Sequence, residues 1–258
     1  MILGILQARV SSTRLPGKVL KPILGKPMLA RQIERLKGCR LLDRLLVATS
    51  RDLLDDPVAL LCAEEGVDCF RGSLDDVLDR FYQAARPFHP AHVVRFTGDC
   101  PLIDPALVDS LIQFHLAGGY DYSSNSLEPT YPDGLDAEAC RFGCLEQAWR
   151  EAALASQREH VTPFIYRQPG RFSIGVLRNA SDLSSLRWTV DEPADFDLVT
   201  EIYRALYPGK PHFDCSDILA FLDAHPELKS INTGHERNEG LRKSLIQDAP
   251  FNGGKGES

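Results

Sequence analysis

The sequence lacks the features that mark several classes of protein. Among its 258 residues, no apolar run approaches the length of about 20 residues that spans a membrane. The N-terminus shows no charged segment, apolar stretch and cleavage site in the order of a signal peptide. The net charge of -7 provides no general basic field for nucleic acid or anionic membranes. We therefore expect a cytoplasmic protein that binds neither nucleic acid nor membrane.

The cysteines follow no disulfide or zinc pattern. All seven are scattered along the chain, and no two are spaced as C-x-x-C. An odd number of cysteines without framework spacing is typical of reduced thiols in a cytosol. Cys140, Cys144 and His160 could be combined into a zinc site, but the pattern favours cysteines that serve as small buried apolar side chains.

The two best-known phosphate-binding loops are also missing. A Walker loop ends in Gly-Lys-Ser/Thr, whereas Gly17-Lys18 is followed here by Val19, and Ser12 occupies the position of the first glycine. No G-x-G-x-x-G segment follows the first apolar run either. The sequence therefore excludes the common P-loop and dinucleotide-binding patterns.

What the sequence does contain is a regular alternation of short apolar runs and amphipathic segments. In the first half, strands are predicted for the run that begins at Ile2 and for 44–50, 67–70 and 92–97; helices are predicted for 27–36, for 56–65 and for the segment capped by 73–76. The second half is less regular, with strands expected at 120–124, 136–140 and 172–177, and helices at 144–155, 159–166, 194–207 and 216–224. Strands that alternate with helices predict a mostly parallel sheet in a three-layer α/β/α domain. We expect one domain over 1–250 and a frayed tail over 251–258.

A short cationic segment directly follows the first predicted strand. It carries Arg9, Arg14 and Lys18 together with three hydroxyl side chains, a glycine and a proline. An apolar strand followed by a basic loop is a suitable layout for a polyphosphate at the carboxyl edge of a parallel sheet. Arginine can bind phosphate oxygens with two donors, and lysine supplies a point charge. Composition alone is equally compatible with an ordinary solvated basic loop.

Two acidic residues occupy comparable positions after apolar runs. Asp99 lies in the turn Gly98-Asp99-Cys100-Pro101, and Asp191 lies between a predicted strand and a helix that begins near Pro193. Mg²⁺ favours one or two carboxylates combined with phosphate oxygens and water. The alternative for each is structural, because Asp99 suits a turn and Asp191 is a good N-cap residue.

These segments together resemble the cytidylyltransferases that make CMP-sialic acid and CMP-deoxyoctulosonate, and most closely the spore coat polysaccharide biosynthesis protein F family. The resemblance is carried by four stretches: Gln7-Ala8-Arg9, Arg14-Leu15-Pro16-Gly17-Lys18, Gly98-Asp99-Cys100-Pro101-Leu102-Ile103-Asp104, and Asp191-Glu192-Pro193-Ala194-Asp195. It implies a Rossmann-like sheet of the GT-A-like nucleotidyltransferase type. It also implies an enzyme that converts CTP and a sugar, expected to be acidic, into a CMP-sugar and pyrophosphate for surface polysaccharide or glycan biosynthesis.

The resemblance also assigns expected roles to individual residues. It implies Mg²⁺ on Asp99 and Asp191, and catalytic roles for Lys18, Arg9 and Asp99. The expected nucleotide-binding residues are Leu6, Gln7, Ala8, Arg9, Ser11, Ser12, Arg14, Lys18 and Arg71. Weaker matches place Asp133, Glu138 and His160 on the sugar side. His160 could act as a general base, although a lone histidine on an amphipathic helix more often serves packing.

Several alternatives stay open at this point. The strand before Asp99 ends in Arg95-Phe96-Thr97 rather than the Gln-Pro-Thr-Ser pattern of the sialic-acid branch, so the sugar is undetermined. A GT-A type glycosyltransferase would also use an acid and Mg²⁺, but it usually needs Asp-x-Asp, and position 101 is proline. A non-catalytic nucleotide-sugar binding subunit is the other alternative. The resemblance leaves a homodimer open as the assembly.

Overall fold

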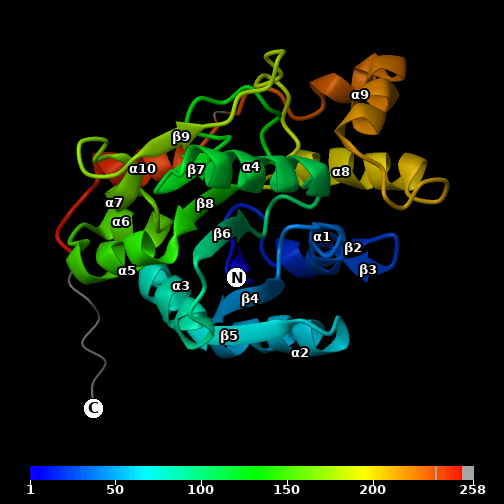
Figure 1. Cartoon of the computed structure of the whole chain (residues 1–258). Helices are drawn as coiled ribbons and strands as arrows, with labels where there is room; N and C mark the ends of the chain where they lie inside the picture. The colour runs from blue at the N-terminus through cyan, green and yellow to red at the C-terminus, as the bar shows by residue number, and fades with distance from the viewer. Residues whose placement is uncertain (236, 252–258) are drawn as a thin grey trace.

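The computed structural model describes residues 1–235 and 237–251 of the chain. Its centre is a seven-stranded sheet in the order β5-β4-β1-β6-β8-β7-β9, and a separate two-stranded sheet pairs β2 with β3 (Figure 1). The strands are β1 (Ile2–Gln7), β2 (Pro22–Ile23), β3 (Lys26–Pro27), β4 (Arg44–Ser50), β5 (Asp68–Gly72), β6 (His92–Thr97), β7 (Tyr122–Ser124), β8 (Glu138–Arg141) and β9 (Ile174–Val176).

The sheet is parallel in its first part and mixed in its second. β1 lies between β4 and β6 and is parallel to both, and β5 extends the sheet in the same direction. β8 is antiparallel to β6 and β7, whereas β7 and β9 are again parallel. The predicted mostly parallel sheet is therefore confirmed, with β8 as the reversed strand.

Helices cover both faces of this sheet. The α-helices are α1 (Met28–Leu36), α2 (Asp56–Glu64), α3 (Val77–Ala85), α4 (Pro105–Gly118), α5 (Phe142–Glu151), α6 (Ala155–His160), α7 (Pro163–Tyr166), α8 (Pro193–Leu206), α9 (Cys215–Ala224) and α10 (Glu239–Ile246). Short 3₁₀ helices are η1 (Lys18–Leu20), η2 (Leu53–Asp55), η3 (Arg86–Phe88) and η4 (Pro226–Ser230).

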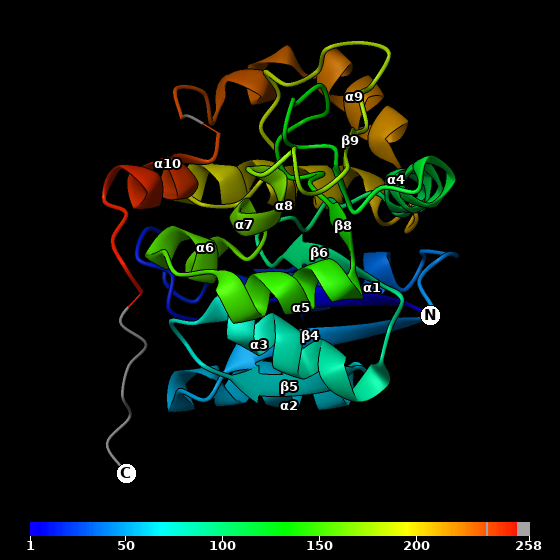
Figure 2. The ribbon, with the colours of Figure 1, turned by 60° about the vertical axis from the view of Figure 1, so that its left-hand side comes forward.

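Two hydrophobic cores show how the layers are formed. One core contains apolar side chains of α1, α2, α4, α8 and α9, and the other contains those of α3, α5 and α7. Successive residues of β1 separate between them: Ile5 packs into the second core, and Leu6 packs into the first. Figure 2 shows α3 and α5 next to each other on one side of the sheet. The expected three-layer α/β/α architecture is confirmed.

The register of β1 and β6 brings the two best sequence motifs to one edge. Gln7 at the end of β1 pairs with Thr97 at the end of β6, so the cationic loop and Asp99 leave the sheet side by side. A Cβ at Gly98 would lie 2.9 Å from the carbonyl oxygen of Gln7, so glycine allows this close approach. The backbone N–H of Val190 donates to the carbonyl oxygen of Asp99 at 2.8 Å, which brings the third motif to the same place.

Several local predictions need correction. The helix expected over 159–166 is two short helices, because Val161 adopts a left-handed φ of 71° between α6 and α7. The N-cap of α3 is Asp76, whose side chain accepts from the N–H of Asp79, and Ser73 instead supports Asp76. No element was predicted where α10 forms.

Three further features of the described chain concern its cysteines, the length of its helices and its C-terminal end. All seven cysteines are free thiols. Within the described part of the chain, no helix is long and apolar enough to cross a membrane. Phe251, where the predicted tail begins, donates its N–H to the carbonyl oxygen of Ala153 at 2.7 Å. The rest of that tail, 252–258, lies outside the described residues.

Candidate active site

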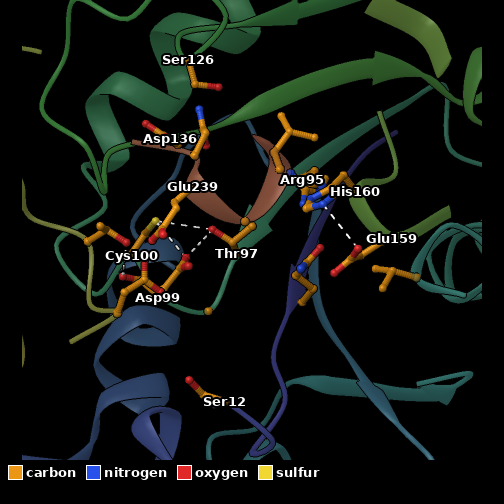
Figure 3. A pocket seen from close by; sticks show the side chains of 18 of the residues that line it. Ser12, Arg95, Thr97, Asp99, Cys100, Ser126, Asp136, Glu159, His160 and Glu239 are labelled. Atoms are coloured by element: carbon orange, nitrogen blue, oxygen red, sulfur yellow. Dashed lines mark hydrogen bonds and ion pairs between the residues drawn. The ribbon is translucent and has the colours of Figure 1, made fainter. Parts of the chain in front are cut away.

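A cavity of about 550 Å³ lies at the carboxyl edge of β1 and β6. The loop after β1 and the end of β6 form one side of it. The opposite side consists of the turn over 131–136, β8, the region from α6 to α7, and residues 238–243. Figure 3 shows Asp99 on one side of this space, and Arg95 with His160 on the other. Segments far apart in the sequence therefore enclose one site.

Lys18 is the central cation of this cavity. Its ammonium donates to the carbonyl oxygen of Val190 at 2.7 Å and to Asp191 Oδ1 at 2.9 Å, and it lies 3.8 Å from Asp99 Oδ2. The side chain is only 12% exposed. The preceding Gly17 has a φ of 69°, a conformation that glycine adopts freely as the loop enters η1. Asp99 and Asp191, which are far apart in the sequence, thus lie near the same ammonium.

The environment of Asp99 favours its charged form. Thr97 and Cys100 donate hydrogen bonds to the Asp99 carboxylate, as Figure 3 shows with dashed lines. Burial acts to raise the pKa of Asp99, but the Lys18 ammonium and these two hydrogen bonds outweigh it and hold the pKa below its ordinary value. An ionised carboxylate is the form that a cation requires.

Arg14 is held by carboxylates as well. Its guanidinium lies 2.9 Å from Asp191, 3.7 Å from Glu192 and 3.5 Å from Glu239 on α10. Without a ligand, the second and third cations of the loop, Arg14 and Lys18, therefore both have protein counterions.

A second group of carboxylates lies in the turn over 131–136. Asp133 pairs with Arg187 at 3.2 Å and with Arg237 at 3.6 Å, and Arg237 also donates to Asp136. Burial raises the pKa of Asp136 to about 7, the Arg237 guanidinium opposes this, and the Asp133 carboxylate adds to it. At Gly134, where φ is 105°, a Cβ would lie 2.4 Å from the backbone nitrogen of Thr189, so the turn packs closely on the strand-like segment beside it.

Glu138 organises the side of the cavity far from the cationic loop. Its Oε1 accepts from the Tyr122 hydroxyl at 2.5 Å and from the Thr162 hydroxyl at 2.6 Å, and its Oε2 pairs with Arg95 on the neighbouring strand. Both Arg95 and Glu138 are mostly buried, at 15% and 11% exposed. A buried ion pair with additional hydrogen bonds fixes the position of Arg95 in the cavity wall.

His160 lies on this side but is tied to α10. Its Nε2 lies 3.0 Å from the Ser244 hydroxyl, which also donates to Glu159. Burial lowers the pKa of His160, with the Arg95 charge acting in the same direction and Glu159 opposing. The zinc site imagined from Cys140, Cys144 and His160 does not form, because no metal-binding group of three such residues occurs among the residues described.

The structure brings most of the predicted site residues into one cavity and leaves two outside it. The residues that line the cavity are Gln7, Ala8, Arg9, Ser11, Ser12, Arg14, Lys18, Asp99, Asp133, Glu138, His160 and Asp191. Leu6 is fully buried in a hydrophobic core. Arg71 donates to the carbonyl oxygens of Ser50 at 2.9 Å and Asp52 at 2.8 Å, which connects a loop to β5, and it does not line the cavity, so its nucleotide contact stays a prediction.

The sequence analysis assigned no individual role to several charged residues of the cavity. These are Arg80, Arg95, Asp136 and Arg187 in its lining and Arg237 just behind it. Asp136 lies between Asp133 and Glu138, which weaker matches to the family already placed on the sugar side, so a signal was present for it. Arg237 is 101 residues from Asp136, and no local pattern connects the two.

The oxygen donors at the site fit Mg²⁺. Asp99 and Asp191 present carboxylates toward one point, which the Lys18 ammonium shares. Because Mg²⁺ takes only one or two protein carboxylates and completes its shell with phosphate oxygens and water, a pair of this kind is sufficient.

Comparisons with known proteins agree with this geometry. The sequence model of a family described as cytidylyltransferase matches residues 3–204. The spore coat polysaccharide biosynthesis protein SpsF of Bacillus subtilis is 33% identical over 88% of this chain and 95% of its own length. A cytidylyltransferase structure from Leptospira borgpetersenii is 28% identical, covers 91% of this chain and 99% of its own, and has a TM-score of 0.85. A CMP:2-keto-3-deoxy-manno-octonic acid synthetase complexed with CTP shares the fold, with 19% identity, 79% of this chain and 98% of its own covered, and a TM-score of 0.61.

Proposed function

Because the chain belongs to the cytidylyltransferase family, we propose that it transfers CMP from CTP to a hydroxyl of an acidic sugar and releases pyrophosphate. The observation that carries this proposal is the position of Lys18, between the cationic loop and the Asp99–Asp191 pair in one cavity. Such a site can hold a triphosphate and a metal together. The product would be a precursor for polysaccharide biosynthesis, and a triphosphate donor with seven free thiols suits a cytoplasmic enzyme.

In this reaction the protein has mainly to position the two substrates and to neutralise the negative charge of the phosphates. The sugar oxygen forms a bond to the α-phosphorus while the bond to pyrophosphate breaks, and negative charge spreads over the phosphate oxygens. Lys18, Arg14 and Arg9 line the cavity and would bind these oxygens. Bound Mg²⁺ on Asp99 and Asp191 would supply Lewis-acid neutralisation of the phosphates. With the two carboxylates committed in that way, Lys18 and Arg14 can turn from them to the nucleotide.

The acidic nature of the sugar is supported by Arg95. This guanidinium lies in the far wall of the cavity, and Glu138 fixes it through a buried ion pair. Its Nε has no hydrogen-bond partner among the residues described. An arginine held in this way can bind a carboxylate with planar geometry, which suits a sugar acid better than a neutral sugar.

Pyrophosphate release tests the proposal directly. The full-length protein is incubated with Mg²⁺ and each of the four nucleoside triphosphates against a panel of sugar acids and their neutral analogues. The proposal expects release that depends on CTP and on a sugar acid. Release with a neutral sugar alone would contradict the acidic specificity, and transfer from a nucleoside diphosphate sugar without pyrophosphate would favour a glycosyltransferase.

A further inference from the structure

One arginine of the cavity has no role in the site described so far. Arg80 lies on α3, its side chain is 1% exposed, and it lines the cavity beside the cationic loop. Its Nη1 donates to the carbonyl oxygen of Ser73 at 2.7 Å. A Cβ at Gly72 would lie 2.9 Å from its Cγ, so the stem is packed against the end of β5. The guanidinium is therefore held firmly in place.

The charge of Arg80 lacks a counterion. Burial and the charge of the Arg9 guanidinium together lower the pKa of Arg80 to about 10, although the Asp55 and Asp76 carboxylates act in the opposite direction. Among the residues described, no carboxylate forms an ion pair with Arg80 or Arg9, and the Nε of Arg80 has no hydrogen-bond partner. Arg9, which also lines the cavity, is thus a second cation close to Arg80.

The two carboxylates whose charges act on Arg80 have other partners. Asp55 accepts from the backbone N–H of Val10 at 2.7 Å and from Ser50. Asp76 caps α3 and lies 3.5 Å from Arg158. Neither acid forms an ion pair with Arg80, although the charges of both act on it.

The contrast with the other cations of the loop is informative. Lys18 and Arg14 each touch two or more carboxylates, whereas Arg9 and Arg80 touch none in the described chain. Burying a charge without a partner costs free energy. An unpaired buried arginine in a cavity wall therefore indicates that an anionic ligand binds there.

We propose that Arg80, together with Arg9, binds anionic oxygens of the nucleotide's phosphate chain and thereby forms a second, metal-independent phosphate contact in the cavity. This inference rests on the proposed function, because the anion is taken to be the phosphate chain of CTP. Arg80 belongs to a helix of the scaffold and not to the loop, so the contact is preformed before the nucleotide arrives.

Calorimetric binding without Mg²⁺ tests this assignment with four probes: CTP, CMP, cytidine and inorganic tripolyphosphate. Arg80→Gln should weaken CTP and tripolyphosphate binding roughly 10- to 100-fold, as expected for one lost charge-assisted contact, and leave cytidine binding unchanged. Arg80→Lys should lose less affinity for CTP and tripolyphosphate, because lysine keeps the positive charge. Arg86→Gln, on an exposed arginine just after the same helix, is the matched control and should bind all four probes as the wild type does.

A measurement on the wild-type protein covers the case in which Arg80→Gln does not fold. The ¹⁵N signal of the Arg80 Nε–H, assigned by comparison with Arg80→Lys, should shift with CTP and tripolyphosphate but not with cytidine. Unchanged CTP affinity in both Arg80 variants, or an equal loss for cytidine and CTP, would overturn the phosphate assignment. A wild-type protein that binds no nucleotide would instead contradict the proposed function, so the two failures are distinguishable.

Discussion

The two sides of the cavity are built in different ways. The side formed by the loop after β1 and the end of β6 consists of two short motifs that parallel pairing brings together, since Gln7 and Thr97 are partners in register. The opposite side joins the turn over 131–136, β8, α6 and α10, which are connected by polar contacts such as Arg237 with Asp136 and Ser244 with His160. We propose that the first side binds the phosphates. The second side is held together by long-range charge pairs, and we propose that it binds the acceptor.

The largest effect is expected at the metal pair of the first side. Asp99→Asn and Asp191→Asn should each abolish Mg²⁺-dependent turnover, because an amide cannot supply the charge that holds the ion. Metal-free nucleotide binding should be largely retained. Steady-state pyrophosphate release and Mg²⁺ titration measure this, with Asp182→Asn in an exposed loop as the control. Full turnover in either variant would show that the two carboxylates do not share an ion.

Asp136 provides a test of the second side through pH. Its folded-state pKa of about 7 lies above the ordinary value of 3.8, so between these values the folded state keeps a proton that the unfolded state has lost. Its contribution to stability is complete below the lower value and is lost as the pH rises toward 7. Asparagine does not titrate, so the free energy of unfolding of Asp136→Asn minus that of the wild type should rise between pH 4 and 7, by up to about 1.4 kcal/mol per pH unit.

Urea unfolding at four pH values measures that difference. Asp223→Asn, whose carboxylate is 73% exposed, serves as the control and should show a nearly constant difference from the wild type. A constant difference for Asp136→Asn as well would mean that the second side does not hold this carboxyl in its neutral form.

Lys18 provides a further test of the first side of the cavity. Lys18→Ala should lower turnover at least tenfold while the fold survives, because one charge-assisted contact to a transferring phosphate is worth ~1.5–3 kcal/mol. Lys26→Ala is a suitable control, since Lys26 is 49% exposed and pairs only with Glu65 among the described residues. If Lys18→Ala kept full activity with every nucleotide, the loop would not be the phosphate site.

The smallest effect is expected at Arg71. Since its guanidinium binds the carbonyl oxygens of Ser50 and Asp52, Arg71→Gln should leave CTP affinity within about twofold and lower stability by about 1 kcal/mol. Arg14→Gln, on a cavity residue, should lose CTP affinity in the same calorimetric series. If Arg71→Gln lost as much CTP affinity as Arg14→Gln, Arg71 would be shown to contact the nucleotide.

The first side could be predicted from the sequence because its determinants are local. A strand that ends in a cationic loop and a strand that ends in Gly98-Asp99 need only parallel pairing to meet, and the alternation of elements predicts that pairing. Lys18, Asp99 and Asp191 accordingly lie close together at this edge of the sheet, and their roles in binding and catalysis stay predictions.

The second side of the cavity could not be predicted from local sequence patterns, for physical reasons. The reversed direction of β8 and the position of α10 depend on packing and on polar contacts such as that of Ser244 with His160. The burial of individual arginines could not be predicted from the sequence either. Arg71 and Arg80 occur in similar sequence surroundings, yet Arg71 donates to a loop carbonyl oxygen and Arg80 lines the cavity.

Thermal unfolding of the wild-type protein with each nucleoside triphosphate in Mg²⁺ buffer tests the central claim most directly. A ligand that binds only the folded state stabilises it by mass action, by about 2.7 kcal/mol at a concentration of 100 times Kd. Gln7, Ala8 and Arg9 line the cavity. We expect their backbone groups to bind a pyrimidine, because a purine would need a wider slot of the kind that glycines provide. CTP should therefore raise the unfolding temperature more than ATP or GTP does. Equal shifts from all four nucleotides, or a larger shift from a nucleoside diphosphate sugar, would contradict a CTP-dependent transferase.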